Sequence, residues 1–139
     1  MKSLSVKLGV ILIGLLIFGY AEVWGADWKL YGDSEYYMGF YDAQNITHPS
    51  KNIVRVWTRW DYKEIGVIDY VRKFGEEYKN FSFAIGLWEI NCVEKMRNLV
   101  SGTYYDNKGE VIYSSDSPSE WKVIIPGTMY ENLYKEVCK

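Results

Sequence analysis

The first 26 residues limit what the rest of the chain can fold into, because they have the layout of a secretory signal peptide. Two lysines precede an apolar run over residues 8–18, and small residues follow it. The uncharged stretch is about 14 residues long, short of the roughly 20 that span a bilayer core. We therefore expect cleavage between residues 21 and 26 and no transmembrane anchor in the mature protein. Residues 27–139 are left as one exported domain.

Export also bears on the two cysteines, Cys92 and Cys138, because a disulfide can form and persist outside the cytoplasm. Two cysteines allow one intramolecular bridge, and a loop of this size gains roughly 4 kcal/mol in the chain-entropy model. A redox-active pair would be close in sequence, as in Cys-x-x-Cys, and these two are far apart. The sequence thus predicts one structural disulfide.

The charge balance excludes two classes of partner. Without residues 1–26, which hold two lysines and one glutamate, the chain keeps 14 basic and 17 acidic residues. A nucleic-acid partner calls for a basic face, and so does docking on anionic lipid. We expect neither.

No residue pattern predicts catalysis. The single histidine, His48, precedes a proline in a polar stretch, so a histidine-based triad or metal site has little to build on. No glycine-rich phosphate loop is present, and carboxylate pairs arise by chance among this many acidic residues. The sequence therefore predicts a non-enzymatic protein without a metal or cofactor.

Alternation of apolar and polar residues is clearest over residues 52–62 and indicates a half-buried strand. One predicted face holds Val54, Val56, Trp60 and Tyr62. The other holds Arg55, Trp57, Arg59 and Asp61. Further strands are predicted at residues 28–31, 36–41, 82–92, 99–105, 110–114 and 121–125, with a loop at 44–51.

Two segments change to helical spacing. In residues 64–79 the predicted apolar stripe is Ile68, Val71, Phe74, Gly75 and Tyr78. A C-terminal helix begins after Thr128, where Glu131 completes a capping-box pattern. The predicted fold is α+β: an antiparallel sheet of about six strands with a C-terminal helix, a second flanking helix and one internal disulfide.

Aromatic residues are unusually frequent, and some cannot be buried. Trp57 shares its predicted strand face with Arg55 and Arg59. Either helices cover this face, or it is an exposed aromatic and arginine surface that docks a protein, a glycan or a second copy of the domain. We take these three residues as the candidate binding surface.

Several short motifs resemble those of one family. They are LWEINC at 87–92, TYYD at 103–106, WKVIIPG at 121–127, LYKEVC at 133–138 and the aromatic strand VRVWTRW at 54–60. In this order, and with these two cysteine contexts, the chain resembles the surface-adhesin protein E family of Gram-negative bacteria.

The resemblance spans nearly all of residues 27–138 and implies a small antiparallel sheet with helical flanks and an internal disulfide. It also implies a surface or secreted binding protein, in the best-known members an adhesin for host extracellular-matrix and serum proteins. The family's adhesin is lipid-anchored, whereas no cysteine lies near the cleavage sites here. Periplasmic, outer-membrane-associated and released forms are therefore all compatible with the sequence, and residues 64–79 have no counterpart that we can place.

We accordingly predict an exported non-enzymatic binding protein that engages an extracellular-matrix-type or envelope protein through its aromatic and arginine sheet surface. A homodimer is a further option for that surface. The alternatives are a small-molecule or glycan-binding envelope protein and a structural component of an envelope assembly.

Overall fold

The structure is a computed structural model that describes residues 25–139, so the expected signal peptide lies almost entirely outside the described residues. The strands are β1 (Trp28–Asp33), β2 (Tyr37–Asp42), β3 (Thr47–Ser50), β4 (Ile53–Tyr62), β5 (Phe81–Asn91), β6 (Met96–Asp106), β7 (Val111–Ser115) and β8 (Lys122–Val123). The helices are α2 (Glu64–Phe74), the short 3₁₀ helix η2 (Glu76–Tyr78) and α3 (Met129–Val137).

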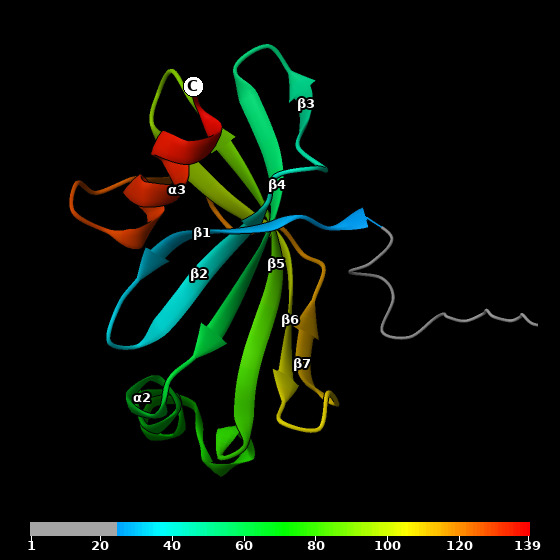
Figure 1. Cartoon of the computed structure of the whole chain (residues 1–139), viewed down its shortest axis with the longest axis vertical. Helices are drawn as coiled ribbons and strands as arrows, with labels where there is room; N and C mark the ends of the chain where they lie inside the picture. Colours follow the sequence, from blue (N-terminus) through cyan, green and yellow to red (C-terminus); the bar gives the residue numbers. More distant parts are fainter. Residues whose placement is uncertain (1–24) are drawn as a thin grey trace, which may run out of the picture.

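All strands belong to one antiparallel sheet in the order β1-β2-β4-β5-β6-β7 (Figure 1). The short strand β3 pairs with β4, and β8 pairs with β6. The sheet has eight strands, against the predicted number of about six, and two details were wrong. Residues 44–51 were expected to be a loop and contain β3, and the strand expected over 121–125 is only Lys122–Val123. The architecture is mainly antiparallel β with two α-helices, so the α+β description fits only roughly.

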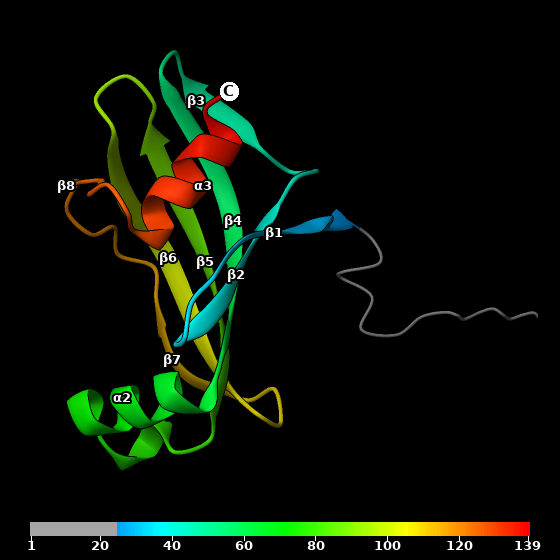
Figure 2. The ribbon, with the colours of Figure 1, turned by 60° about the vertical axis from the view of Figure 1, so that its left-hand side comes forward.

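The two faces of the sheet differ because side chains alternate along each strand. On β4 the even-numbered residues Val54, Val56, Thr58 and Trp60 are buried. We call this the inner face, and both α-helices pack against it at opposite ends of the long axis (Figures 1 and 2). Its core joins strand, helix and loop residues: Tyr31, Tyr41, Val56, Trp60, Tyr78, Phe81, Ala84, Trp88, Ile90, Ile124 and Leu133. The odd-numbered residues of β4 lie on the opposite side, the outer face.

Helix α3 begins and is held as the sequence predicts. The Thr128 side chain accepts a hydrogen bond from the Glu131 amide at 3.4 Å, and the Glu131 carboxylate accepts one from the Gly127 amide at 3.0 Å. This last bond lowers the pKa of Glu131. Cys92 and Cys138 form the expected disulfide, which joins the end of β5 to the end of α3.

Helix α2 confirms a helix after residue 63, but its predicted apolar stripe was partly wrong. Ile68 and Phe74 are more than half exposed, whereas Val67, Tyr70 and Val71 pack against the core. The helix approaches the sheet through Gly66, where a Cβ atom would lie 2.3 Å from the Tyr36 carbonyl oxygen. This close contact brings Val67, Tyr70 and Val71, rather than Ile68 and Phe74, toward the core. The helix ends at Gly75, whose φ of 112° favours glycine.

Candidate binding surface

The three residues of the predicted surface, Arg55, Trp57 and Arg59, all lie on the outer face of β4. Neither α-helix covers this face, since α2 and α3 both pack on the inner one. The interpretation in which helices cover it is therefore wrong for the described residues 25–139. The face is open, and its chemistry depends on how these side chains are held.

Arg55 is held by a carboxylate on the neighbouring strand. Glu89 of β5 is its direct cross-strand partner, and one Glu89 oxygen accepts from Nη2 at 2.6 Å and from Nε at 3.0 Å. The Arg55 side chain is 41% exposed, so the pair is worth at most about 1 kcal/mol of stability. Its effect is to orient the guanidinium and to cancel its charge.

Arg59 is held in a similar way by different groups. Its Nε donates to the Asp61 carboxylate at 2.7 Å, and its Cζ lies 4.2 Å from the centre of the Phe83 ring. A guanidinium over an aromatic face at this distance is a cation–π contact. Both arginines thus already have acidic partners, so the surface does not present a net positive patch to an anionic ligand.

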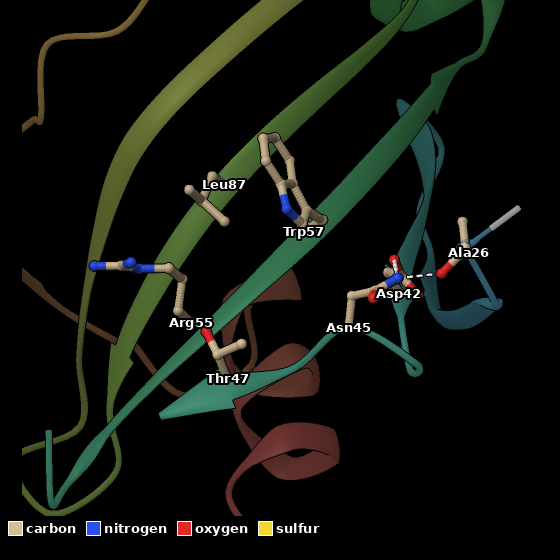
Figure 3. A pocket seen from close by; sticks show the side chains of 8 residues that line it. Ala26, Asp42, Asn45, Thr47, Arg55, Trp57 and Leu87 are labelled. Carbon is tan, nitrogen blue, oxygen red and sulfur yellow. Dashed lines mark hydrogen bonds between the residues drawn. The ribbon is translucent and has the colours of Figure 1, made fainter. Parts of the chain in front are cut away.

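Trp57 is the exposed aromatic centre of the surface, with 39% of its area accessible. It lies beside its cross-strand partner Leu87 and lines a shallow pocket of about 520 Å³ together with Arg55 (Figure 3). The other lining residues are Gly25, Ala26, Asp42, Asn45, Thr47 and Leu87.

The pocket exists because one edge of β4 is covered in two separate pieces. Strand β2 pairs with β4 as far as Thr58, and β3 pairs with Arg55 and Ile53. Within the described part of the chain, no strand pairs with Trp57 from that side, because residues 43–46 form the connection between β2 and β3. The alternation in the sequence located Trp57 but did not predict this gap. Pro49 favoured a loop over residues 44–51, so β3 was not predicted.

The loop beside the pocket is fixed by the buried carboxylate of Asp42. It accepts hydrogen bonds from the Asp27 amide at 2.9 Å, the Gln44 amide at 3.0 Å and the Asn45 side chain at 2.7 Å. Because these three N–H groups donate to the carboxylate, the cost of burying its charge is compensated. Asp42 was not singled out from the sequence, although an acidic residue at a strand end before a polar loop is a common turn signal.

Arg59 does not line the same pocket. It borders a smaller depression of about 170 Å³ with Trp28, Phe40 and Asp61. The structure therefore brings Arg55 and Trp57 together and places Arg59 at a neighbouring site on the same face.

Groups that could suggest catalysis lie elsewhere or have no partners of the right kind. His48 is exposed on β3. Among residues 25–139, no cluster of three or more His, Cys, Asp or Glu side chains is arranged to hold a metal ion. The tyrosines whose pKa is raised by burial, such as Tyr37 and Tyr62, belong to the inner face.

Among residues 25–139, no helix has the length and apolar character needed to cross a membrane.

Taken together, the molecule is an antiparallel-sheet domain with helices on one face, a disulfide that fixes its C-terminal helix, and an open aromatic face. The sequence profile of surface-adhesin protein E matches residues 28–139, so the chain belongs to the surface-adhesin protein E family. This confirms the family resemblance. Membership makes the chain an adhesin-like protein of an exported or surface-located family.

A solved structure shares the fold of this chain. The crystal form II structure of Haemophilus influenzae protein E aligns with a TM-score of 0.51 and 16% identity, over 72% of this chain and 79% of that chain. Another structure of Haemophilus influenzae protein E gives a TM-score of 0.47 and 16% identity, over 72% and 76%. No curated protein sequence matches the chain.

Proposed function

We propose that the domain is a non-enzymatic binding protein that engages a protein partner through its outer face, with Trp57 as the anchor. The observation that carries the proposal is a tryptophan 39% exposed on a sheet face that no helix of the described chain covers. Tryptophan and arginine are over-represented among the residues that dominate protein interfaces.

The neighbours of Trp57 favour a protein over a small ligand. Half-buried apolar side chains continue across the face on adjacent strands, so the surface is broad: Phe40, Phe83, Ile85 and Leu87. The charged groups among them are arginines with acidic partners close by. An apolar centre with satisfied charges around it is the usual composition of a protein interface.

The family supports the type of partner without naming it. An extracellular-matrix-type protein fits an adhesin displayed at the cell surface, and an envelope protein fits a periplasmic form. A second copy of the domain is the remaining occupant for this face. The signal peptide at residues 1–26 stays a prediction.

The chain contains a matched control for testing Trp57. Trp121 has the same exposed fraction, 39%, and lies in the segment before β8. We would immobilise the exported domain and measure binding to purified extracellular-matrix and serum proteins by biolayer interferometry, for the native chain, Trp57→Ala and Trp121→Ala. For any partner that binds, Trp57→Ala should weaken affinity about tenfold or more, as loss of an interface anchor does. Trp121→Ala should stay within about twofold of the native value.

Equal weakening by both variants would place the interface elsewhere. If no tested protein binds, light scattering of the native chain and of Trp57→Ala would measure the molar mass and so test for a homodimer. A dimer that Trp57→Ala dissociates would make the domain its own partner, and a monomer would remove the support for a docking face.

Localisation decides which partners are relevant. Fractionation of cells into periplasm, outer membrane and medium, followed by reducing and non-reducing gels, measures it directly. Protein at the surface or in the medium favours an external partner. Purely periplasmic protein excludes adhesion and directs the search to envelope proteins.

A further inference from the structure

A second pocket lies far from Trp57, where α2 and η2 meet the edge of the sheet. Its volume is about 280 Å³, near the lower limit for ligand pockets, which suits one compact chemical group. Every side chain that lines it is aromatic, and they come from α2, η2, β6 and β7: Tyr70, Phe74, Tyr78, Tyr104 and Tyr113.

The pocket has a floor of one buried and two half-buried rings, and an exposed rim. On the floor, the centre of the Tyr70 ring lies 5.4 Å from that of Tyr78 and 6.0 Å from that of Tyr104. Tyr78 and Tyr104 meet edge to face at 84°, with their centres 6.4 Å apart. The rim residues Phe74 and Tyr113 are 57% and 53% exposed. The three floor rings thus pack directly against one another, and the two exposed rings of the rim remain accessible beside them.

The electrostatics of this pocket favour a cation. The face of an aromatic ring carries a negative potential, which attracts ammonium groups within about 6 Å of the ring centre. No lysine or arginine is among the lining residues.

The absence of polar lining groups other than phenols narrows the type of cation. The Tyr70 phenol is already engaged by Tyr62 and Tyr104. A primary ammonium has three N–H donors that would lose their hydrogen bonds to water here, and a sugar has several hydroxyls with the same problem. A quaternary ammonium has no donor to satisfy, so rings alone can replace its weak hydration.

We propose that the Tyr70–Tyr78–Tyr104 pocket binds a quaternary ammonium group of the choline type. The methyl groups would lie against the floor rings, with Phe74 and Tyr113 at the rim. This site is separate from the outer face and does not depend on the function proposed for Trp57.

The test uses choline chloride and its neutral isostere, in which carbon replaces the quaternary nitrogen. Chemical-shift titration of the exported domain should show choline binding with shifts at the five lining rings, and binding of the isostere at least about fivefold weaker. Phe74→Ala and Tyr113→Ala remove exposed rings, so the fold is retained. Each should weaken choline binding about threefold, and both together about tenfold.

The matched control is Tyr105→Ala, because Tyr105 stacks on Phe83 on the outer face at 4.7 Å. This variant and Trp57→Ala should leave choline binding unchanged. Equal affinity for choline and its isostere would mean that the pocket is merely apolar and would overturn the proposal. The absence of choline binding would also overturn it. So would a Tyr105→Ala variant that loses as much choline affinity as the rim variants.

Vesicles identify the source of the ligand once choline binds. The ligand is a lipid headgroup if the domain is retained on phosphatidylcholine vesicles but not on phosphatidylglycerol vesicles. The Phe74→Ala/Tyr113→Ala double variant should then lose this retention. Choline binding without vesicle retention supports the same pocket and assigns a soluble choline compound.

Discussion

Two tryptophans on strand β4 show that the two faces of this sheet differ in burial. Trp60, on the inner face, is 7% exposed, and its Nε1 donates a hydrogen bond of 2.6 Å to the Tyr31 hydroxyl. Trp57, three residues earlier, points to the outer face and is 39% exposed. The same residue type therefore stabilises the fold on one side and remains available for contact on the other. The difference follows from the strand period alone.

Polar groups follow the same division. The inner face buries phenols among other aromatic rings, as for Tyr62 beside Phe81 at 4.4 Å. The outer face keeps charged groups in pairs that solvent still reaches, such as Arg55 with Glu89. We expect perturbations of ionisation to act on stability through the inner face, and on binding through the outer face.

The largest expected effect is alkaline unfolding. Burial raises the pKa of Tyr31, Tyr37 and Tyr62 well above the ordinary value of 10.0. In the unfolded chain these phenols ionise near pH 10, so the folded state binds more protons above that pH. The stabilisation is complete below pH 10 and falls by about 1.4 kcal/mol per pH unit above it for each such tyrosine. Circular dichroism and tyrosinate absorbance should change together.

A Tyr62→Phe variant sharpens this test, because it removes one of the titrating phenols from the inner face. Its stability should fall less steeply above pH 10 than that of the native chain. If tyrosinate absorbance rises near pH 10 while the domain is still folded, the inner phenols are accessible to solvent. The contrast between the two faces would then fail.

The next effect compares the two tryptophans directly. Trp60→Ala should lower the free energy of unfolding by about 5 kcal/mol, because it leaves a cavity and removes the donor to Tyr31. Trp57→Ala should cost under about 1 kcal/mol, since its side chain is already partly in water. Denaturant titration of both variants measures the difference. Similar costs would mean that Trp57 is a core residue and not a free contact.

Much of the fold was predictable because local signals agree. Alternation over residues 52–62 placed β4 and both of its faces, and Thr128 with Glu131 marked the start of α3. The stripe of α2 was not predictable, because the contact of Gly66 with the Tyr36 carbonyl is a tertiary constraint. No periodicity within residues 64–79 contains that information.

The third effect tests the disulfide, which fixes the inner-face helix α3. A Cys92→Ser/Cys138→Ser variant should lose roughly 4 kcal/mol of stability, as expected for a bridge that closes a long loop. Tyr134 contacts the Cys92 carbonyl at 3.1 Å and Leu133 is buried, so α3 should detach first. Hydrogen exchange would show early loss of protection in residues 129–137 with the outer face unaffected. Uniform loss across the sheet would contradict this order.

The candidate binding surface was predictable only in part. The strand period placed Arg55, Trp57 and Arg59 on one face, but their partners come from distant segments. Glu89 reaches Arg55 through the β4–β5 register, and Phe83 lies under Arg59 for the same reason. The aromatic pocket near α2 draws on four elements, so spacing along the chain could not predict it.

The smallest expected effect concerns the Arg55–Glu89 pair on the outer face. Its guanidinium is 41% exposed, so solvent screens the attraction and the side chain loses rotamer freedom on pairing. A double-mutant cycle of Arg55→Ala and Glu89→Ala should give a coupling in unfolding free energy below about 1 kcal/mol, and smaller still at high salt. A coupling above about 2 kcal/mol would show that the outer-face charges help hold the sheet together, so the two faces would no longer separate stability from contact. A small coupling combined with a larger loss of partner affinity in Arg55→Ala would sharpen the contrast, because the pair would then orient the guanidinium for binding.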